Sequence, residues 1–308
     1  MMLCSGLAAL GATLTPSMEA IVTCRASQNS SHLVPTVVKH RNGSTHYVMA
    51  AFSKHQDVVS RFIANTGVWE DIYGVDDVVG WPAVGGTFLD IGANLGYLSF
   101  KFASARFNVF AVEPIPTNRR AIQTTLCAHP EMATSGFHLI PTAVGTFNGS
   151  CKMTMNGNNR GNAHLKCSPN DRHPTCANGK RSSAGCEVVP VVPLDEALAI
   201  VPTDASRPVV TKIDLEGHEC QALETGAQTL FGRLGVDYLF IETQHSWVSK
   251  CVNETADKYG YVVGEAQGDN KNRLLKRRHM HEGHMRRNAE PQRAKSDRSH
   301  GLMATHGG

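Results

Sequence analysis

The stretch FLDIGANLG, residues 88–96, joins a short apolar run to a glycine-containing turn. We predict that Phe88–Ile91 forms a buried strand and that a helix begins at about Tyr97, so that the turn connects the two. The glycines are spaced G-x-x-x-G, whereas dinucleotide-binding loops carry G-x-G-x-x-G. A carboxylate at Asp90, at the mouth of this turn, repels a pyrophosphate and attracts a cationic ligand.

Beyond residue 87, short apolar runs alternate with segments of helical periodicity. This alternation predicts an α/β fold, with a doubly wound, mostly parallel sheet that carries helices on both faces. In such sheets ligands bind at the carboxyl ends of the strands, near the point where the strand order reverses. We therefore expect the functional residues to follow directly after the predicted strands.

A lead-in element precedes this alternation. The segment TVVKHRNGSTHYVMA, residues 36–50, predicts a hairpin that turns at Asn42 and Gly43. Ser53–Gln56 has the pattern of a capping box for an amphipathic helix that Gly67 can end. The predicted organisation has four parts. The N-terminal segment (1–30) is left open between a signal, a disordered stretch and an ordinary helix. The lead-in (31–86), the main domain with a Cys-rich insertion at 151–186 (87–265), and a basic, His-rich, disordered tail (266–308) follow it.

Acidic residues follow three more of the predicted strands. Glu113 ends the second strand, where a carboxylate can accept hydrogen bonds from both hydroxyls of a ribose. In an extended chain Asp214 and Glu216 point to one face, together with Lys212. Glu242 follows a further apolar run. These acids can hold a substrate hydroxyl, accept its proton or bind a divalent ion, although the pattern does not require a metal.

Three neighbouring residues have a simpler interpretation. Glu219 stands where a helix is expected to begin, and an acid at that position is favourable to the helix dipole. His218 and His245 lie close to the acidic motifs, but a histidine at such a position is more often a surface or capping residue. We leave a structural role open for all three.

The remaining sequence features bear on location and partners. Residues 271–308 contain ten Lys or Arg against three Asp or Glu, which predicts a tail that contacts solvent or anionic surfaces but no specific nucleic acid. Four of the nine cysteines lie at 151, 167, 176 and 186 without a C-x-x-C pair, which argues against zinc and leaves a disulfide-linked loop open. The apolar residues 1–14 lack a preceding base, so we slightly favour a soluble intracellular protein over one in the secretory lumen.

Taken together, the motifs DIGANLG (90–96), EP (113–114) and KIDLEG (212–217), with a strand-ending Glu242, resemble the FkbM family of methyltransferases that use S-adenosylmethionine (SAM). The resemblance covers roughly residues 55–262. It implies a fold similar to class I methyltransferases and O-methylation of a hydroxyl on a sugar or a small natural product. The residues expected to bind SAM are Asp90, Gly92, Asn94, Gly96 and Glu113, and those expected to face the acceptor and act in catalysis are Asp214, Glu216 and Glu242.

The chain departs from the family pattern in three ways. His218 stands where a small residue is usual, and the insertion at 151–186 is longer than expected, so it can form a lid over the substrate. The chain after Tyr261 looks too short and polar for the usual last pair of strands, which predicts a truncated sheet.

Two other hypotheses remain. An oxidoreductase that uses NAD is disfavoured by Asp90 and by the missing middle glycine. A SAM-fold protein that binds a partner without turnover is disfavoured by the acids that follow three strands.

Overall fold

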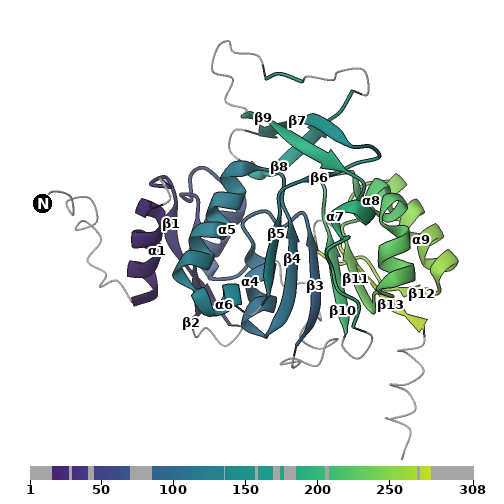
Figure 1. Cartoon of the computed structure of the whole chain (residues 1–308), viewed down its shortest axis with the longest axis horizontal. Coiled ribbons are helices and arrows are strands. Elements are labelled where there is room, and N and C mark those ends of the chain that lie inside the picture. Colours follow the sequence, from purple (N-terminus) through teal and green to yellow (C-terminus); the bar gives the residue numbers. More distant parts are fainter. Residues whose placement is uncertain are drawn as a thin grey trace, which may run out of the picture.

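A seven-stranded sheet forms the centre of the molecule (Figure 1). The computed structural model describes residues 16–27, 30–40, 45–69, 85–134, 136–156, 159–168, 174–176, 185–204, 208–268 and 271–278. The strand order is β12-β13-β11-β10-β3-β4-β5. The strands are β3 (Gly86–Ile91), β4 (Phe107–Val112), β5 (Phe137–Ile140), β10 (Val209–Ile213), β11 (Tyr238–Ile241), β12 (Tyr261–Val263) and β13 (Arg273–Arg277).

The five strands from β11 to β5 are parallel, and β13 is antiparallel to both of its neighbours. The chain adds β4 and β5 on one side of β3 and then crosses to β10 on the other side. The strand order therefore reverses between β3 and β10, and this reversal places a binding cleft at their carboxyl ends. The predicted doubly wound α/β fold is confirmed.

Helices cover both faces of the sheet because alternate strand residues enter two different cores. Phe88 packs in the core shared with the lead-in, whereas its neighbour Leu89 packs in the core on the opposite face. The first face carries α4 (Tyr97–Ser104), α5 (Pro116–Ala128) and α6 (Pro130–Thr134). The second face carries α7 (Leu194–Ala197), α8 (Glu219–Thr225), the π-helical turn η1 (Gln228–Arg233) and α9 (Ser246–Tyr259). Among the described residues, no helix has the length and apolar character needed to cross a bilayer.

The predicted hairpin and helix of the lead-in are present as β1 (Val34–Lys39), β2 (Thr45–Ala51) and α2 (Val58–Thr66). The predicted turn at Asn42 and Gly43 lies outside the described residues. The capping box at Ser53–Gln56 is wrong, since this segment closes its own turn through a hydrogen bond from Gln56 N to Ser53 O. Asp57 caps α2 instead, and its carboxylate accepts the Ser60 amide at 2.7 Å.

The N-terminal segment contains a helix that belongs to the fold. In α1 (Pro16–Ser27), Ile21 is buried in the same core as the hairpin, and Cys24 forms a disulfide with Cys127 of α5. Of the alternatives left open for residues 1–30, residues 16–27 therefore form an ordinary helix, and a disordered stretch or a signal is wrong for them. Residues 1–15 lie outside the described part of the chain.

The last described segment corrects two predictions about the C-terminus. We expected disorder from residue 266 and a sheet without its last pair of strands, but β12 and β13 complete that pair. The basic side chains that surround β13 hide its strand pattern, although Leu275 is fully buried against the α8–α9 side of the sheet. Residues 279–308 of the predicted tail lie outside the described residues.

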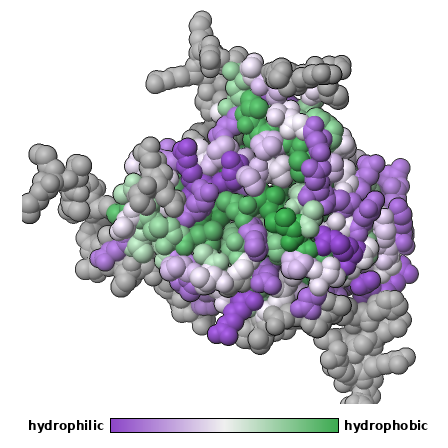
Figure 2. Space-filling model, viewed as in Figure 1, coloured by the Kyte–Doolittle hydropathy of each residue, from purple (hydrophilic) through white to green (hydrophobic). Residues whose placement is uncertain are grey.

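The Cys-rich insertion contributes to a small sheet above the carboxyl ends of the main strands (Figure 1). Its strands, in the order β6-β9-β7-β8, are β6 (Ala143–Val144), β7 (Gly149–Asn156), β8 (Asn159–Lys166) and β9 (Cys186–Val192). The short segment 137–144 is thus divided between two sheets, with β5 in the main sheet and β6 in the small one. Disulfides Cys151–Cys167 and Cys176–Cys186 link the insertion internally. Figure 2 shows one apolar area on this small sheet and another across the middle of the main body.

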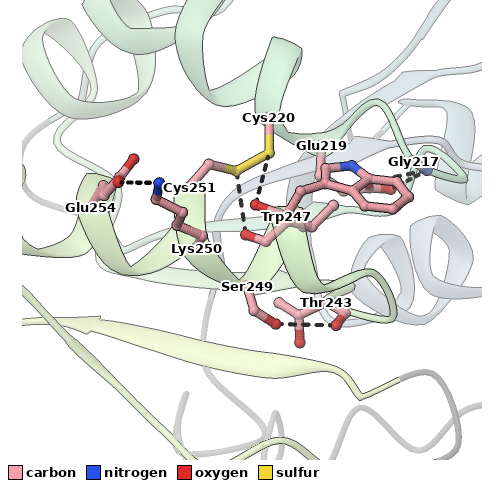
Figure 3. Close-up of a disulfide and its surroundings, with 10 residues drawn as sticks. Gly217, Glu219, Cys220, Thr243, Trp247, Ser249, Lys250, Cys251 and Glu254 are labelled. Atoms are coloured by element: carbon pink, nitrogen blue, oxygen red, sulfur yellow. Dashed lines mark hydrogen bonds and ion pairs between the residues drawn. A yellow bond between two sulfur atoms is a disulfide. The ribbon is translucent and has the colours of Figure 1, made fainter.

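A fourth disulfide joins Cys220 of α8 to Cys251 of α9 (Figure 3). Together with Cys24–Cys127, it links segments that the sequence pattern did not pair, since these bonds span 103 and 31 residues. Every cysteine in the described part of the chain is therefore disulfide-bonded.

The burial of Leu275 leads to a stability test. We predict that Leu275→Ala lowers the free energy of unfolding by about 2–5 kcal/mol, because it leaves a cavity in a filled core. The control is Val262→Ala on neighbouring β12, where the side chain is 42% exposed and the expected change is within about 0.5 kcal/mol. Denaturant unfolding measures both. Equal effects of the two substitutions would contradict the placement of β13.

Candidate active site

A cleft opens at the carboxyl ends of β3, β4 and β10, below the small sheet. Its volume is about 280 Å³. Seven of the eight residues proposed for the site from sequence line it, namely Asp90, Gly92, Asn94, Glu113, Asp214, Glu216 and Glu242. Gly96 does not line the cleft. It precedes α4 with a φ of 80°, a left-handed conformation that glycine adopts without strain.

Asp90 ends β3 as a buried carboxylate that faces the cleft. Its Oδ2 accepts a hydrogen bond of 2.6 Å from the Ser99 hydroxyl. Within the described residues its Oδ1 has no hydrogen-bond partner and lies 3.8 Å from Lys212 Nζ. Burial raises the pKa of Asp90, and Lys212 and Ser99 act against that rise. The site thus holds a carboxylate that a further cation would stabilise.

The turn after Asp90 approaches the turn after β10 very closely. A β-carbon at Gly92, whose φ is 89°, would lie 2.0 Å from the carbonyl oxygen of Asp214. Glycine is therefore required here by the contact between two protein loops. Asn94 also has a positive φ, 51°, which asparagine tolerates better than most residues.

Glu113 directly follows β4 and fixes the turn that follows β3. Its carboxylate accepts the amides of Asn94 and Ile115, each at 2.8 Å, and the Asn118 side chain at 3.4 Å. Burial raises the pKa of Glu113 to about 7, and these hydrogen bonds limit the rise. Glu113 therefore positions Asn94 and also presents a carboxylate to the cleft.

Lys212 connects the two halves of the site. Its ammonium lies 2.7 Å from Gly92 O, 3.2 Å from Asp214 Oδ2 and 3.8 Å from Asp90 Oδ1, and its side chain is only 11% exposed. The sequence placed it on the same face as Asp214 but gave it no role. The register explains the contact, since Lys212 and Asp90 are directly opposite each other on β10 and β3.

The acids after β10 lie in a turn rather than in an extended chain. β10 ends at Ile213, and Glu216 has a φ of 53°, so the alternation that we used to align Asp214 with Glu216 does not apply. Glu219 fixes this turn by accepting the amides of Leu215 and Gly217 at 2.8 and 3.2 Å. A non-glycine residue in this backbone region is strained, and such strain is concentrated at functional sites.

Glu242 lies at the end of β11 and is 5% exposed. Burial, together with the negative charges of Asp214, Glu216 and Glu219, raises its pKa to about 9, and Lys212 acts in the opposite direction. Glu242 therefore keeps its proton at neutral pH when no additional cation is present.

Three of these acids form a compact group. Carboxylate oxygens of Asp214, Glu219 and Glu242 all lie within 4.8 Å of one another. Oxygen ligands of this kind suit a hard divalent cation. The same closeness also explains why Glu242 holds a proton, so the group is consistent with either a bound cation or a shared proton.

His218 and His245 stand directly before helices, but neither side chain makes a capping hydrogen bond to the described residues. His218 precedes α8 and lines the cleft, and His245 precedes α9. The His245 ring stacks on Trp247, with ring centroids 4.2 Å apart.

Sequence reasoning missed the walls of the cleft. Val58 and Trp69 of the lead-in line one side, and Met153, Ala163 and Leu165 of the small sheet line another. The available signal was the alternation of apolar and polar residues along β7 and β8, which puts apolar side chains on one face. Met153 and Leu165 lie opposite each other in the register of that hairpin. These apolar walls suit the flat ring of a bound cofactor.

Comparison with known proteins identifies the class. Residues 90–268, more than half of the chain, match the methyltransferase FkbM domain, and the chain belongs to that family. It is therefore a methyltransferase for which SAM is the expected cofactor. No curated protein matches the chain.

Several solved structures are similar in fold. The precorrin-6y C5,15-methyltransferase of Geobacter metallireducens GS-15 has 12% identity and a TM-score of 0.35, over 62% of this chain and 78% of its own. The METTL16 methyltransferase domain has 11% identity and a TM-score of 0.41, over 83% and 91%. A methyltransferase from Geobacter sulfurreducens has 12% identity and a TM-score of 0.36, over 87% and 91%. The family assignment rests on the domain match.

The cleft fits SAM on the chemistry of its side chains. Oδ1 of buried Asp90, which accepts no hydrogen bond from the described residues, suits a cationic group, and Glu113 can accept hydrogen bonds from ribose hydroxyls. Ile115 and Leu165 supply apolar surface for an adenine ring. Glu113 thus holds the loop through the Asn94 amide and also faces the cleft.

These contacts predict the cofactor affinity. Asp90→Ala and Glu113→Ala should each weaken binding of SAM and S-adenosylhomocysteine by about 1–3 kcal/mol, because each removes a charged hydrogen-bond acceptor. Asp257→Ala, which removes a carboxylate that is 85% exposed on α9, should have no effect. Titration calorimetry measures the affinities. Unchanged SAM affinity in both site variants, or tight binding of NAD, would refute the cofactor assignment.

Proposed function

We propose that the protein transfers the methyl group of SAM to a hydroxyl oxygen on a sugar or a small natural product. The observation that supports this proposal is the position of Asp214, Glu216 and Glu242, which line the same cleft as Asp90 and Glu113. One cleft thus offers a cofactor end and an acceptor end. A neutral hydroxyl is a weak nucleophile, so an acceptor end rich in carboxylates suits a reaction that must remove a proton.

On the cofactor side, bound SAM supplies an electrophilic methyl group. The negative charges around Lys212 favour entry of its cationic end, and Asp90 and Glu113 orient it. Residues of the small sheet and Trp69 line the cleft and supply apolar walls, which disfavour water at the acceptor position. These residues bring the two reactants together, and proximity alone lowers the barrier substantially.

On the acceptor side, the three acids have different roles. Glu242, with its pKa of about 9, carries a proton at neutral pH and can donate a hydrogen bond to the acceptor. Asp214 is 27% exposed and paired with Lys212, so its carboxylate is accessible and fixed in place. We propose that Asp214 or Glu216 accepts the hydroxyl proton as the C–O bond forms, and that Glu242 orients the oxygen.

A second version of this mechanism uses a divalent ion. The group Asp214, Glu219 and Glu242 can bind such an ion, which would orient the acceptor oxygen and lower its pKa. In that version the cation also displaces the proton of Glu242.

Amide substitutions separate the two versions. If a carboxylate is the direct base, Asp214→Asn or Glu216→Gln should lower kcat by about 10²–10⁴-fold. Glu242→Gln, which mimics the protonated form that prevails below pH 9, should keep most of the activity at pH 7, and excess EDTA should have no effect. The measurement is label transfer from methyl-labelled SAM to acceptors in a cell extract.

The metal version gives the opposite pattern. EDTA should abolish the activity, Mg²⁺ or Mn²⁺ should restore it, and Glu242→Gln should be inactive. Full turnover in all three amide variants, with SAM binding intact, would refute both versions and would move the acceptor site towards His218 and His245.

The other two hypotheses carry less support. The carboxylate of Asp90 stands where a NAD-dependent oxidoreductase would need room for a pyrophosphate. A binding protein without turnover does not account for a carboxylate group at the acceptor end of the cleft. Basic residues beyond 278 fall outside the described chain, so a contact of the tail with anionic surfaces stays a prediction.

We also propose that the protein matures in an oxidising compartment such as the secretory lumen, which was the less favoured location on sequence alone. Four disulfides support this proposal, because such bonds persist outside the reducing cytosol. Mass spectrometry of unreduced peptides from the native source should find all four pairs. Free thiols at these positions would contradict it.

A further inference from the structure

An exposed aromatic pair stands beside the acceptor end of the cleft. Trp247 lies in the first turn of α9 and is 56% exposed, which is unusual for an indole. Its ring is nearly parallel to that of His245, with an interplanar angle of 8°. The pair therefore presents an exposed flat ring, held in one orientation by stacking, on which a planar apolar ligand face can pack.

The residues around His245 and Trp247 place this pair next to the site. Gln244, which precedes His245, lines the cleft, as does Glu216. A β-carbon at Gly217 would lie 3.7 Å from His245 Cδ2, so the pair adjoins the turn that carries the acids. In Figure 3 the Trp247 indole extends toward the Gly217–Glu219 turn.

The Cys220–Cys251 disulfide fixes this arrangement. Cys220 directly follows Glu219, and its sulfur lies 3.8 Å from the carbonyl oxygen of Trp247 (Figure 3). The disulfide therefore holds the second turn of α9 against the start of α8, and Trp247 lies one helical turn before Cys251. A pre-positioned ring loses little conformational freedom when a ligand stacks on it.

The surrounding charges indicate what kind of ligand fits. The carboxylates of Asp214 and Glu216 repel an anionic acceptor, such as one that bears phosphate. The same carboxylates, with Gln244 and His218, can exchange hydrogen bonds with several neutral hydroxyls. A flat aromatic surface beside such groups matches a sugar ring, which has apolar C–H faces and a rim of hydroxyls.

We propose that Trp247, backed by His245, forms a subsite for a second sugar unit of a neutral oligosaccharide acceptor, next to the unit that is methylated. Trp247 does not line the cleft itself, and its position just outside matches a neighbouring unit. This inference rests on the proposed methylation of a hydroxyl and adds that the acceptor has at least two sugar units. Trp247 is accordingly a specificity-determining residue and takes no part in the chemistry.

The test uses methyl-labelled SAM with defined saccharide probes, which are the methyl glycosides of glucose, mannose, galactose and N-acetylglucosamine with the matching di- and trisaccharides. The wild-type protein should show a lower KM for the longer members of the series that it methylates. Trp247→Ala should raise KM for these by about tenfold, with a smaller change in kcat. Trp247→Phe, which keeps a flat ring, should recover most of the affinity.

Ile200→Ala is the matched control, since Ile200 is 60% exposed and lies outside the cleft lining. It should leave KM unchanged. The subsite is overturned if KM does not depend on chain length, if Trp247→Ala lowers kcat without raising KM, or if no saccharide is methylated. In the last case, label on hydroxyls of other compounds in a cell extract keeps the proposed function, whereas no hydroxyl methylation in any extract overturns that function too.

Discussion

The site depends on the contacts of the Lys212 ammonium with the carboxylates around it. These contacts lie where the strand order of the sheet reverses. The ammonium bonds the Gly92 carbonyl of one loop at 2.7 Å and the Asp214 carboxylate of the next loop at 3.2 Å. A buried cation without partners would be very costly, and so would the cluster of acids without a cation. Lys212 and the acids therefore stabilise each other's charged forms. Lys212 also holds the turn after β3 close to the turn after β10, and this closeness is possible because Gly92 has no β-carbon.

This balance leaves the cleft with more negative than positive charge. Lys212 is one cation facing Asp90, Asp214, Glu216 and Glu242. Burial raises the pKa values of Asp90 and Glu242, and for Glu242 the neighbouring negative charges add to that rise. A positively charged ligand relieves that excess, whereas a pyrophosphate would add to it. The charge of the cleft therefore agrees with the cofactor that is expected of the FkbM family.

Sequence reasoning found the site residues that directly follow apolar strands. Both the strand and the residue after it can be recognised within one short stretch of sequence. This reasoning placed Asp90, Glu113 and Glu242 correctly at strand ends. It missed what depends on pairing between distant segments, such as the contact of Lys212 with Asp90, which arises from the register of β10 on β3. It also missed the Cys24–Cys127 bond and the strand around Leu275, because neither a cross-link over 103 residues nor a strand among basic residues has a local signal.

The position of β13 has a consequence for how the chain is made. This strand comes last in the described sequence but lies between β11 and β12, and β12 joins the sheet through β13 alone. During synthesis, residues 261–263 therefore have no strand to pair with until residues 273–277 have left the ribosome. The edge of β11 stays open over that interval, as a site where another nascent chain could pair. A chain that ends before β13 loses two strands, so a late stop codon would remove much more of the sheet than its position suggests.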